Sequence, residues 1–326
     1  MEITTPGRIC LFGEHSDYLG LPIIAMAISL RAKISGQKRT DNQVIIYQPD
    51  INETETFSLK DLRYTKPRDY FKSCIKTCQN EGLVFSSGFE CEVSSEIPIR
   101  AGASSSSAIN VSWIHFLSKM ADNPIEWTQE KIGELTYQAE STEFNEPGGM
   151  MDQYTTAMGH IIHLESEPHI SIQSLNPELG SFVLGDSEQP KDTMGILKRL
   201  NDSRVEILNT LRAKNPTINI HTMNNDTNLS DLNKEQRKMY KGTVQNRNLL
   251  RKALVELKKN KPNYQLIGTL LTELHVVLRD IFYISTPKIE SMLEAALSAG
   301  ALGGKITGSG GGGCMFAYAP AHPEKV

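Results

Sequence analysis

The chain has 326 residues, of which 39% are hydrophobic, and it carries a formal net charge of −4 at pH 7. This length and hydrophobic content can supply a full core for one large domain or for two lobes. The small negative charge provides no basic field for nucleic acid or for an anionic membrane surface. The composition therefore favours a small-molecule partner.

Two features indicate the cellular compartment. The five cysteines are odd in number and lack the paired spacing of a zinc site or a secreted disulfide framework, so we expect reduced and mostly buried thiols. No apolar stretch at the N-terminus has the length of a signal peptide, and no uncharged run approaches the roughly 20 residues that span a bilayer. These features predict a cytoplasmic protein without a membrane partner.

The first half of the chain alternates short apolar runs with helical patterns. The apolar runs predict strands at residues 9–12, 44–47 and 89–93. Apolar residues at helical spacing predict amphipathic helices around residues 70–78 and 109–120. We expect a mixed sheet covered by these helices.

The second half begins with strands and becomes strongly helical. Strands are predicted at residues 160–164, 170–174 and 181–185, and long helices at residues 193–214, 234–259 and 264–282. The polar segment 216–231 predicts an exposed loop. A last strand, CMFAYA, stands close to the end of the chain, which indicates a missing or shortened terminal element.

A run of small residues, AGASSSSA, separates a predicted strand from the amphipathic helix at 109–120. Gly102 and four serines would let backbone N–H groups close around an anion at the positive end of that helix. No lysine follows a second glycine, so this is not the GxxxxGK[ST] phosphate loop. The alternative is that the serines only cap the helix.

The stretch TPGRICLFGEHSDYLG places four ionisable side chains around a short apolar strand: Arg8, Glu14, His15 and Asp17. A strand that ends in Glu, His and Asp supplies hydrogen-bond acceptors and a donor to a polyol pocket. The alternative is a solvated turn. The density of polar groups favours a binding site.

The stretch KITGSGGGGCMFAY carries Gly308 and Gly310 to Gly313 between two predicted strands. A backbone almost free of side chains can approach a ligand or another loop closely. A flexible linker is the alternative, but the apolar flanks favour a buried turn. We expect this glycine loop to face the serine loop.

Taken in chain order, these three stretches resemble the three motifs of the GHMP kinases, named for galactokinase, homoserine kinase, mevalonate kinase and phosphomevalonate kinase. GEHSDYLG is similar to the galactokinase signature GEHTDYNGG, NEPGGMMDQ to its GxxCGIMDQ segment, and the helix ELHVVLRDIFYIS to the stretch before the third motif. The resemblance implies a two-lobed α+β GHMP kinase fold. Its N-terminal lobe, residues 1–180, would be of the ribosomal protein S5 domain 2-like type, and its C-terminal lobe, residues 181–326, ferredoxin-like.

The resemblance also implies a phosphoryl transfer from ATP to an alcohol group in the cleft between the lobes. Asp152 would be the catalytic base, and Arg8 would keep it ionised and stabilise the transferring group. Mg²⁺ would be held by Ser106 and Glu140, since it prefers oxygen ligands. The alternatives are a helix N-cap for Asp152 and an exposed helix residue for Glu140.

Carried over position by position, the family's binding residues fall into two groups. The sugar contacts would be Glu14, His15, Asp17, Gly149 and Asp152. The ATP contacts would be Gly102, Ala103, Ser104, Ser105, Ser106, Gly310 and Gly311.

Several departures from the galactokinase pattern leave the sugar open. Cys10 stands in place of Asn, Leu19 in place of the Asn of DYNGG, and the glycine before Gly149 in place of Cys, and no Tyr follows Asp186. Galactose, another hexose, a uronic acid, a pentose or a heptose phosphate all stay open. Asp17 and Asp152 disfavour an anionic substrate such as mevalonate unless basic residues also face the pocket. A catalytically silent sugar sensor is a minor alternative, and the nucleotide base preference and oligomeric state are unknown.

Overall fold

The structure is a computed structural model and describes residues 1–99, 101–146, 148–190 and 192–326. Its larger sheet has the strand order β4-β3-β5-β2-β6-β7, and β1 pairs with β2 off this path. Only the β3–β5 pairing is parallel among the described strands of this sheet. The strand bounds are β1 Glu2–Phe12, β2 Ile23–Lys38, β3 Gln43–Gln48, β4 Glu53–Ser58, β5 Phe89–Ser95, β6 Ile161–Glu165 and β7 Ser171–Leu175.

Four helices accompany this sheet: α1 Tyr70–Asn80, α2 Ser105–Met120, α3 Gln129–Tyr137 and α4 Met151–Met158. Their apolar side chains form one core with those of β3 and β5, in which Trp113 and Phe116 of α2 stack at 5.4 Å between ring centroids. Phe89, Cys91 and Val93 all point into this core, as their alternation predicts. The five cysteines are free and buried, as expected.

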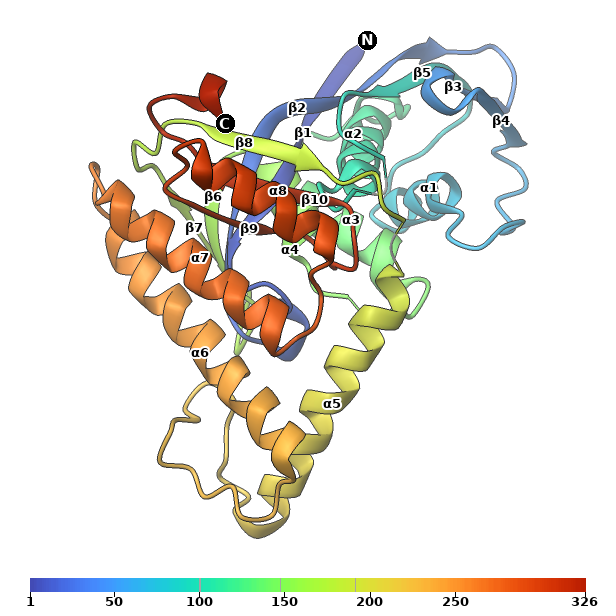
Figure 1. The fold of residues 1–326 in the computed structure, drawn as a ribbon. Helices are drawn as coiled ribbons and strands as arrows, with labels where there is room; N and C mark the ends of the chain where they lie inside the picture. The colour runs from blue at the N-terminus through green and yellow to red at the C-terminus, as the bar shows by residue number, and fades with distance from the viewer. Residues whose placement is uncertain (100, 147, 191) are drawn as a thin grey trace.

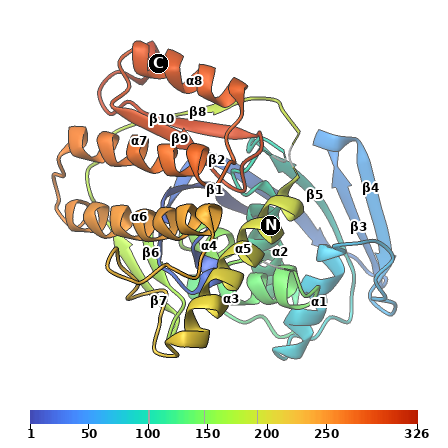
Figure 2. The ribbon, with the colours of Figure 1, turned by 60° about the horizontal axis from the view of Figure 1, so that its bottom comes forward.

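A smaller antiparallel sheet of order β8-β10-β9 lies beside the first (Figure 1). Its strands are β8 Phe182–Asp186, β9 Gly303–Ile306 and β10 Cys314–Tyr318. The helices α6 Lys234–Leu257, α7 Tyr264–Asp280 and α8 Pro287–Ser298 lie in a row on the opposite side of the molecule from the β3–β4 edge (Figure 2). The long helix α5 Thr193–Lys214 runs from the helices of the larger sheet toward α6.

The apolar stripe of α7 is buried against β9, β10 and α8, and the same core contains Ile9, Leu11 and Phe12 of β1. Residues of both predicted lobes thus share one core. The division into residues 1–180 and 181–326 stays a prediction. The α+β class is confirmed, with a mixed sheet and an antiparallel sheet each covered by helices.

Most predicted elements are present. The helix predicted at 193–214 has those bounds, and the segment 216–231 contains neither helix nor strand. The sequence patterns did not predict β2, β4 or α8, and they set no bounds for α3 or α4. No helix within the described ranges combines the length and apolar character needed to cross a membrane.

Candidate active site

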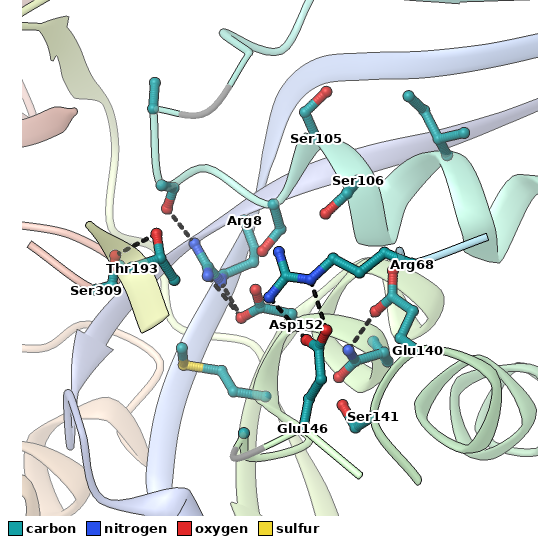
Figure 3. Close-up of a pocket in the computed structure, with 18 of the residues that line it drawn as sticks. Arg8, Arg68, Ser105, Ser106, Glu140, Ser141, Glu146, Asp152, Thr193 and Ser309 are labelled. Atoms are coloured by element: carbon teal, nitrogen blue, oxygen red, sulfur yellow. Dashed lines mark hydrogen bonds and ion pairs between the residues drawn. The ribbon is translucent and has the colours of Figure 1, made fainter. Parts of the chain in front are cut away.

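A cavity of about 780 Å³ opens between the two halves of the chain. Five segments form its wall: the end of β1 with the turn after it, the serine loop, the start of α4, the start of α5 and the glycine loop. Figure 3 shows the polar side chains that point into it. The cavity has the size of a pocket for a small molecule or a nucleotide.

Arg8 and Asp152 form an ion pair in this cavity although they stand 144 residues apart. Arg8 lies on β1, and its Nε and Nη2 atoms donate to Asp152 Oδ1 at 2.8 and 2.5 Å. Its Nη1 donates to the carbonyl of Gly102 in the serine loop. Burial alone would lower the pKa of Arg8, but the charge and hydrogen bonds of Asp152 raise it above its usual value. Arg8 therefore stays charged, and it links the carboxylate to the serine loop (Figure 3).

The serine loop and the glycine loop face each other, as predicted. Cys314 N donates to Ala101 O at 2.6 Å, and a Cβ atom on Gly308 would lie 2.8 Å from Gly102 O. Only a residue without a side chain fits at position 308, where φ is also +77°. The buried hydroxyl of Ser104 has no hydrogen-bond partner, so it can bond a ligand.

The structure brings most, but not all, of the predicted nucleotide contacts to the cavity. Gly102, Ser104, Ser105 and Ser106 line it, whereas Ala103 is buried behind them. In the glycine loop Gly308 and Ser309 line the cavity. Gly310 and Gly311 instead pack against Ile284 and Ile196, and their predicted contact with ATP stays a prediction.

Glu140 projects from the π-helical turn Gln138–Thr142 and is almost completely buried. Its carboxylate accepts hydrogen bonds from Ser107 Oγ at 2.9 Å, Asn110 Nδ2 at 2.6 Å and Gln153 Nε2. Burial raises the pKa of Glu140 to about 7, against the opposing effect of these hydrogen bonds. The serine that contacts Glu140 is thus Ser107, while Ser106 is exposed on the cavity wall.

The oxygen atoms around Glu140 fit a hard divalent cation. Ser106, Ser141, Glu140 and Gln153 all line the cavity, Gln153 Nε2 donates to Glu140, and the buried Gln153 Oε1 has no hydrogen-bond partner. No cluster of three or more His, Cys, Asp or Glu residues with metal-binding geometry occurs in the described part of the chain. Mg²⁺ usually takes one or two carboxylates and completes its shell with water and substrate phosphates, so Glu140 with neighbouring neutral oxygens would be a sufficient protein ligand set.

Glu14 and Lys305 form a buried ion pair at the end of β1. Lys305 Nζ donates to Glu14 Oε2 at 2.6 Å, and the two side chains are 0% and 1% exposed. Glu14 Oε1 has no partner although it is buried, and Glu14 lines the cavity. An unpaired buried oxygen of this kind is a ready acceptor for a ligand hydroxyl.

His15 is held from both sides of its ring. Nε2 lies 3.1 Å from Ser309 O, so this nitrogen carries the proton, and Nδ1 accepts from Tyr18 Oη at 3.1 Å. Arg204 of α5 donates to Tyr18 Oη and to His15 O. Burial, followed by the charge of Arg204, lowers the pKa of His15 to about 3, so the imidazole is neutral.

Asp17 and Gly149 are in direct contact. Asp17 Oδ2 accepts from Met151 N at 3.2 Å, and Oδ1 accepts from Tyr18 N at 3.1 Å. A Cβ atom on Gly149 would lie 1.7 Å from Asp17 Oδ2. Burial raises the pKa of Asp17 to about 6, with the nearby charge of Asp152 adding to the increase.

Four side chains of the site escaped the sequence analysis: Arg68, Ser107, Arg204 and Lys305. The one usable signal was at Lys305, a charged residue inside a strand of small and apolar residues that reads as buried. Arg68 and Arg204 gave no signal, because Glu146 is 78 residues from Arg68 and Tyr18 is 186 residues from Arg204.

Three family models match the chain: the GHMP kinases N-terminal domain at residues 69–160, the GHMP kinases C-terminal domain at 250–326 and the galactokinase galactose-binding signature at 2–38. A mevalonate kinase from Thermococcus gammatolerans is 28% identical over 99% of this chain and 90% of its own length. A galactokinase from Pasteurella multocida is 26% identical over 100% of this chain and 86% of its own length.

Among solved structures, the galactokinase of Lactococcus lactis in complex with galactose has a TM-score of 0.86 at 22% identity, and the match covers 98% of this chain and 85% of that one. This likeness gives the fold. The two GHMP domain models lie in sequence order on the two halves of the chain, and each contains residues of the cavity or of its glycine loop. The chain belongs to the GHMP kinase family of ATP-dependent small-molecule kinases.

Proposed function

We propose that this kinase phosphorylates a hydroxyl group of a neutral sugar, in the manner of a galactokinase-like sugar-1-kinase. The observation that carries the proposal is the Arg8–Asp152 ion pair, which faces the same cavity as the serine loop on one side and Glu14, His15 and Asp17 on the other. The galactose-binding signature over residues 2–38 includes Arg8 and these three residues. The proposal therefore rests on both the geometry and the family match.

In the proposed reaction Asp152 accepts the proton of the attacking sugar hydroxyl. The hydroxyl oxygen forms a bond to the γ-phosphorus of ATP, the bond from that phosphorus to the bridging oxygen breaks, and ADP leaves with the bond electrons. Arg8 pairs with the carboxylate of Asp152 and offers positive charge to the transferring group. Asp152 is one-third exposed in the cavity, so a substrate can reach it.

The phosphates of ATP would lie against the backbone of the serine loop and the N-terminus of α2, with Ser104 Oγ as an additional donor. Glu140 and the hydroxyl of Ser106 would hold Mg²⁺, with Ser107 fixing the orientation of Glu140. Bound there, Mg²⁺ would neutralise charge on the phosphates during transfer. Gly308 would let the glycine loop approach them, and Gly310 and Gly311 would support that loop from behind.

The sugar would contact Glu14, His15, Asp17 and the backbone at Gly149. Glu14 Oε1 and the carboxylate of Asp17 can accept hydrogen bonds from sugar hydroxyl groups, and each lies in the cavity wall beside the Arg8–Asp152 pair. A polyol satisfies several such acceptors at once. An apolar ligand would leave them without partners.

Phosphorylation of mevalonate is the second candidate, since a mevalonate kinase is among the relatives at 28% identity. The acceptor end of the cavity argues against it. Glu14, Asp17 and Asp152 would repel the carboxylate of mevalonate, and the cation nearest to Glu14, Lys305, is completely buried in its ion pair. We therefore favour the sugar.

The test is a coupled ADP-release assay with ATP and Mg²⁺ against galactose, glucose, glucuronate, galacturonate, arabinose, a heptose phosphate and mevalonate. We expect turnover on a neutral sugar, and a loss of about 10²–10⁴-fold in kcat for Asp152→Asn. Turnover on mevalonate alone would contradict the proposal. Sugar binding without turnover on any acceptor would indicate a sensor instead.

A further inference from the structure

The side chain of Arg68 lies in the cavity without a role in the reaction described so far. It comes from the segment between β4 and α1, and its Nε and Nη2 atoms donate to the two carboxylate oxygens of Glu146 at 2.5 and 2.8 Å. Nη2 also lies 2.8 Å from Met194 Sδ at the start of α5. Figure 3 shows the guanidinium pointing into the cavity toward Arg8 and Asp152.

The backbone at Arg68 is fixed in an unfavourable conformation. Its φ of +56° lies in the left-handed region, which a residue with a long side chain rarely adopts. The next residue, Asp69, anchors the chain: it is fully buried and accepts hydrogen bonds from Lys72 Nζ and Thr65 N, each at 3.0 Å. Strain that the surroundings hold in place is often found at functional sites. The anchor leaves the side chain as the part that can move.

The charges in the cavity wall leave a need for a second cation. The described lining residues include seven carboxylates and two positively charged side chains, Arg8 and Arg68. The carboxylates are Glu14, Asp17, Asp50, Glu140, Glu146, Asp152 and Asp192. Arg8 is already bound to Asp152 and Gly102 O. Besides the serine-loop backbone and Ser104 Oγ, Arg68 is therefore the described lining cation that is not bound to Asp152 and could donate to the phosphates.

We propose that Arg68 is a further catalytic residue, which leaves Glu146 when ATP binds and donates to oxygens of the terminal phosphate. A planar guanidinium that already binds a carboxylate through two parallel hydrogen bonds can bind two phosphate oxygens in the same way. Glu146 holds the side chain in place until the nucleotide arrives. The side chains of Arg68 and Glu146 are 42% and 22% exposed. Solvent therefore screens this ion pair, which is weak enough to exchange. This inference rests on the proposed nucleotide site at the serine loop.

Binding of a non-hydrolysable ATP analogue and of ADP, both with Mg²⁺ and without any acceptor, tests the inference independently of the sugar. For Arg68→Ala we expect the analogue to bind at least tenfold more weakly, ADP to bind with less than a threefold change, and kcat to fall about 10²–10³-fold. Glu146→Gln should bind the analogue more tightly than the wild type, because it releases Arg68. If Arg68 only stabilised the fold through Glu146, both variants would weaken nucleotide binding alike.

Arg63→Ala is the matched control, since Arg63 is five residues away, 87% exposed and paired with Asp61 outside the cavity. It removes the same charge and should bind both nucleotides as the wild type does. Arg68→Lys should restore part of the lost affinity for the analogue if Arg68→Ala proves unstable. Equal loss of ADP and analogue affinity in Arg68→Ala, or a change confined to the KM of an anionic acceptor, would overturn the inference. A wild-type protein that binds neither nucleotide would instead refute the proposed function.

Discussion

The carboxylate of Asp17 occupies the space that a side chain at position 149 would need. A Cβ atom on Gly149 would lie 1.7 Å from Asp17 Oδ2 and 1.9 Å from its carboxyl carbon. This contact gives a physical reason for the glycine at position 149, which matches the glycine of the galactokinase segment GxxCGIMDQ. Asp17 reaches further toward α4 here than it could beside any larger residue.

Gly149→Ala should therefore displace Asp17 from the cavity wall. We expect the KM of the acceptor to rise at least tenfold, because a buried hydrogen-bond partner of the sugar is lost. The affinity for ADP should stay within threefold, since the atoms nearest to a Cβ at position 149 belong to Asp17 and not to the serine loop. Steady-state kinetics with a varied acceptor and calorimetry with ADP measure the two effects.

Gly148→Ala is the control for this substitution, because a Cβ atom there would meet only Ser141 Oγ, at 3.8 Å. It makes the same chemical change one residue earlier in the same loop. Equal increases in KM for the two alanine variants would show that loop stiffness matters, and not the position of Asp17.

Lys305→Met should destabilise the protein by about 3–5 kcal/mol, because it leaves the buried carboxylate of Glu14 without its counter-charge. The double variant Lys305→Met with Glu14→Gln should regain part of that loss, since no buried charge is left. Urea unfolding followed by circular dichroism measures both. An additive loss in the double variant would mean that the two side chains are not coupled.

The requirement for Mg²⁺ should depend on pH through Glu140, whose raised pKa of about 7 leaves it mostly protonated at pH 6. A carboxyl group must be ionised to bind the cation well. From pH 8 to pH 6 its ionised fraction falls about tenfold, and the Mg²⁺ concentration for half-maximal rate should rise by about that factor.

Glu143→Gln is the control for this titration, since Glu143 lies one turn away, bonds Tyr64 Oη and does not line the cavity. It should keep the pH dependence of the wild type. A Mg²⁺ requirement that is constant from pH 6 to pH 8 would remove Glu140 from the metal site.

The same raised pKa has a consequence for stability. The pKa of Glu140 is higher in the folded protein than the 4.5 of an ordinary exposed glutamate, so the folded state binds the proton more tightly than the unfolded state does. Glu140 therefore stabilises the folded state most at low pH. The free energy of unfolding should fall as the pH rises from about 4.5 to about 7, and Glu140→Gln should remove this slope.

Much of the site could be read from the sequence because its parts are contiguous. Arg8, Glu14, His15 and Asp17 stand within ten residues at the end of one strand, and the serine loop is marked by its own composition. Elements with a plain pattern, such as α5 and the alternating strand β5, were also predictable.

The rest depended on tertiary structure. β2 was not predicted because it pairs with three strands along its length, and its burial follows those partners instead of a simple alternation. Ser107 bonds Glu140 while Ser106 lies on the cavity wall, because the start of α2 turns one serine inward and the other outward, a rotation that a run of four serines does not reveal. The pairing of Arg68 with Glu146 joins segments 78 residues apart.

Strand β1 carries Arg8 toward the cavity while its apolar side chains Ile9, Leu11 and Phe12 complete the core around α7 and β10. Strand β1 therefore packs in the core of both halves of the chain and also positions Arg8, the ion-pair partner of Asp152. Unfolding either half of the chain, or replacing it with another sequence, would therefore move Arg8. A nucleotide bound across the serine and glycine loops should accordingly protect the backbone amides of α7 from hydrogen exchange, although that helix lies outside the cavity wall.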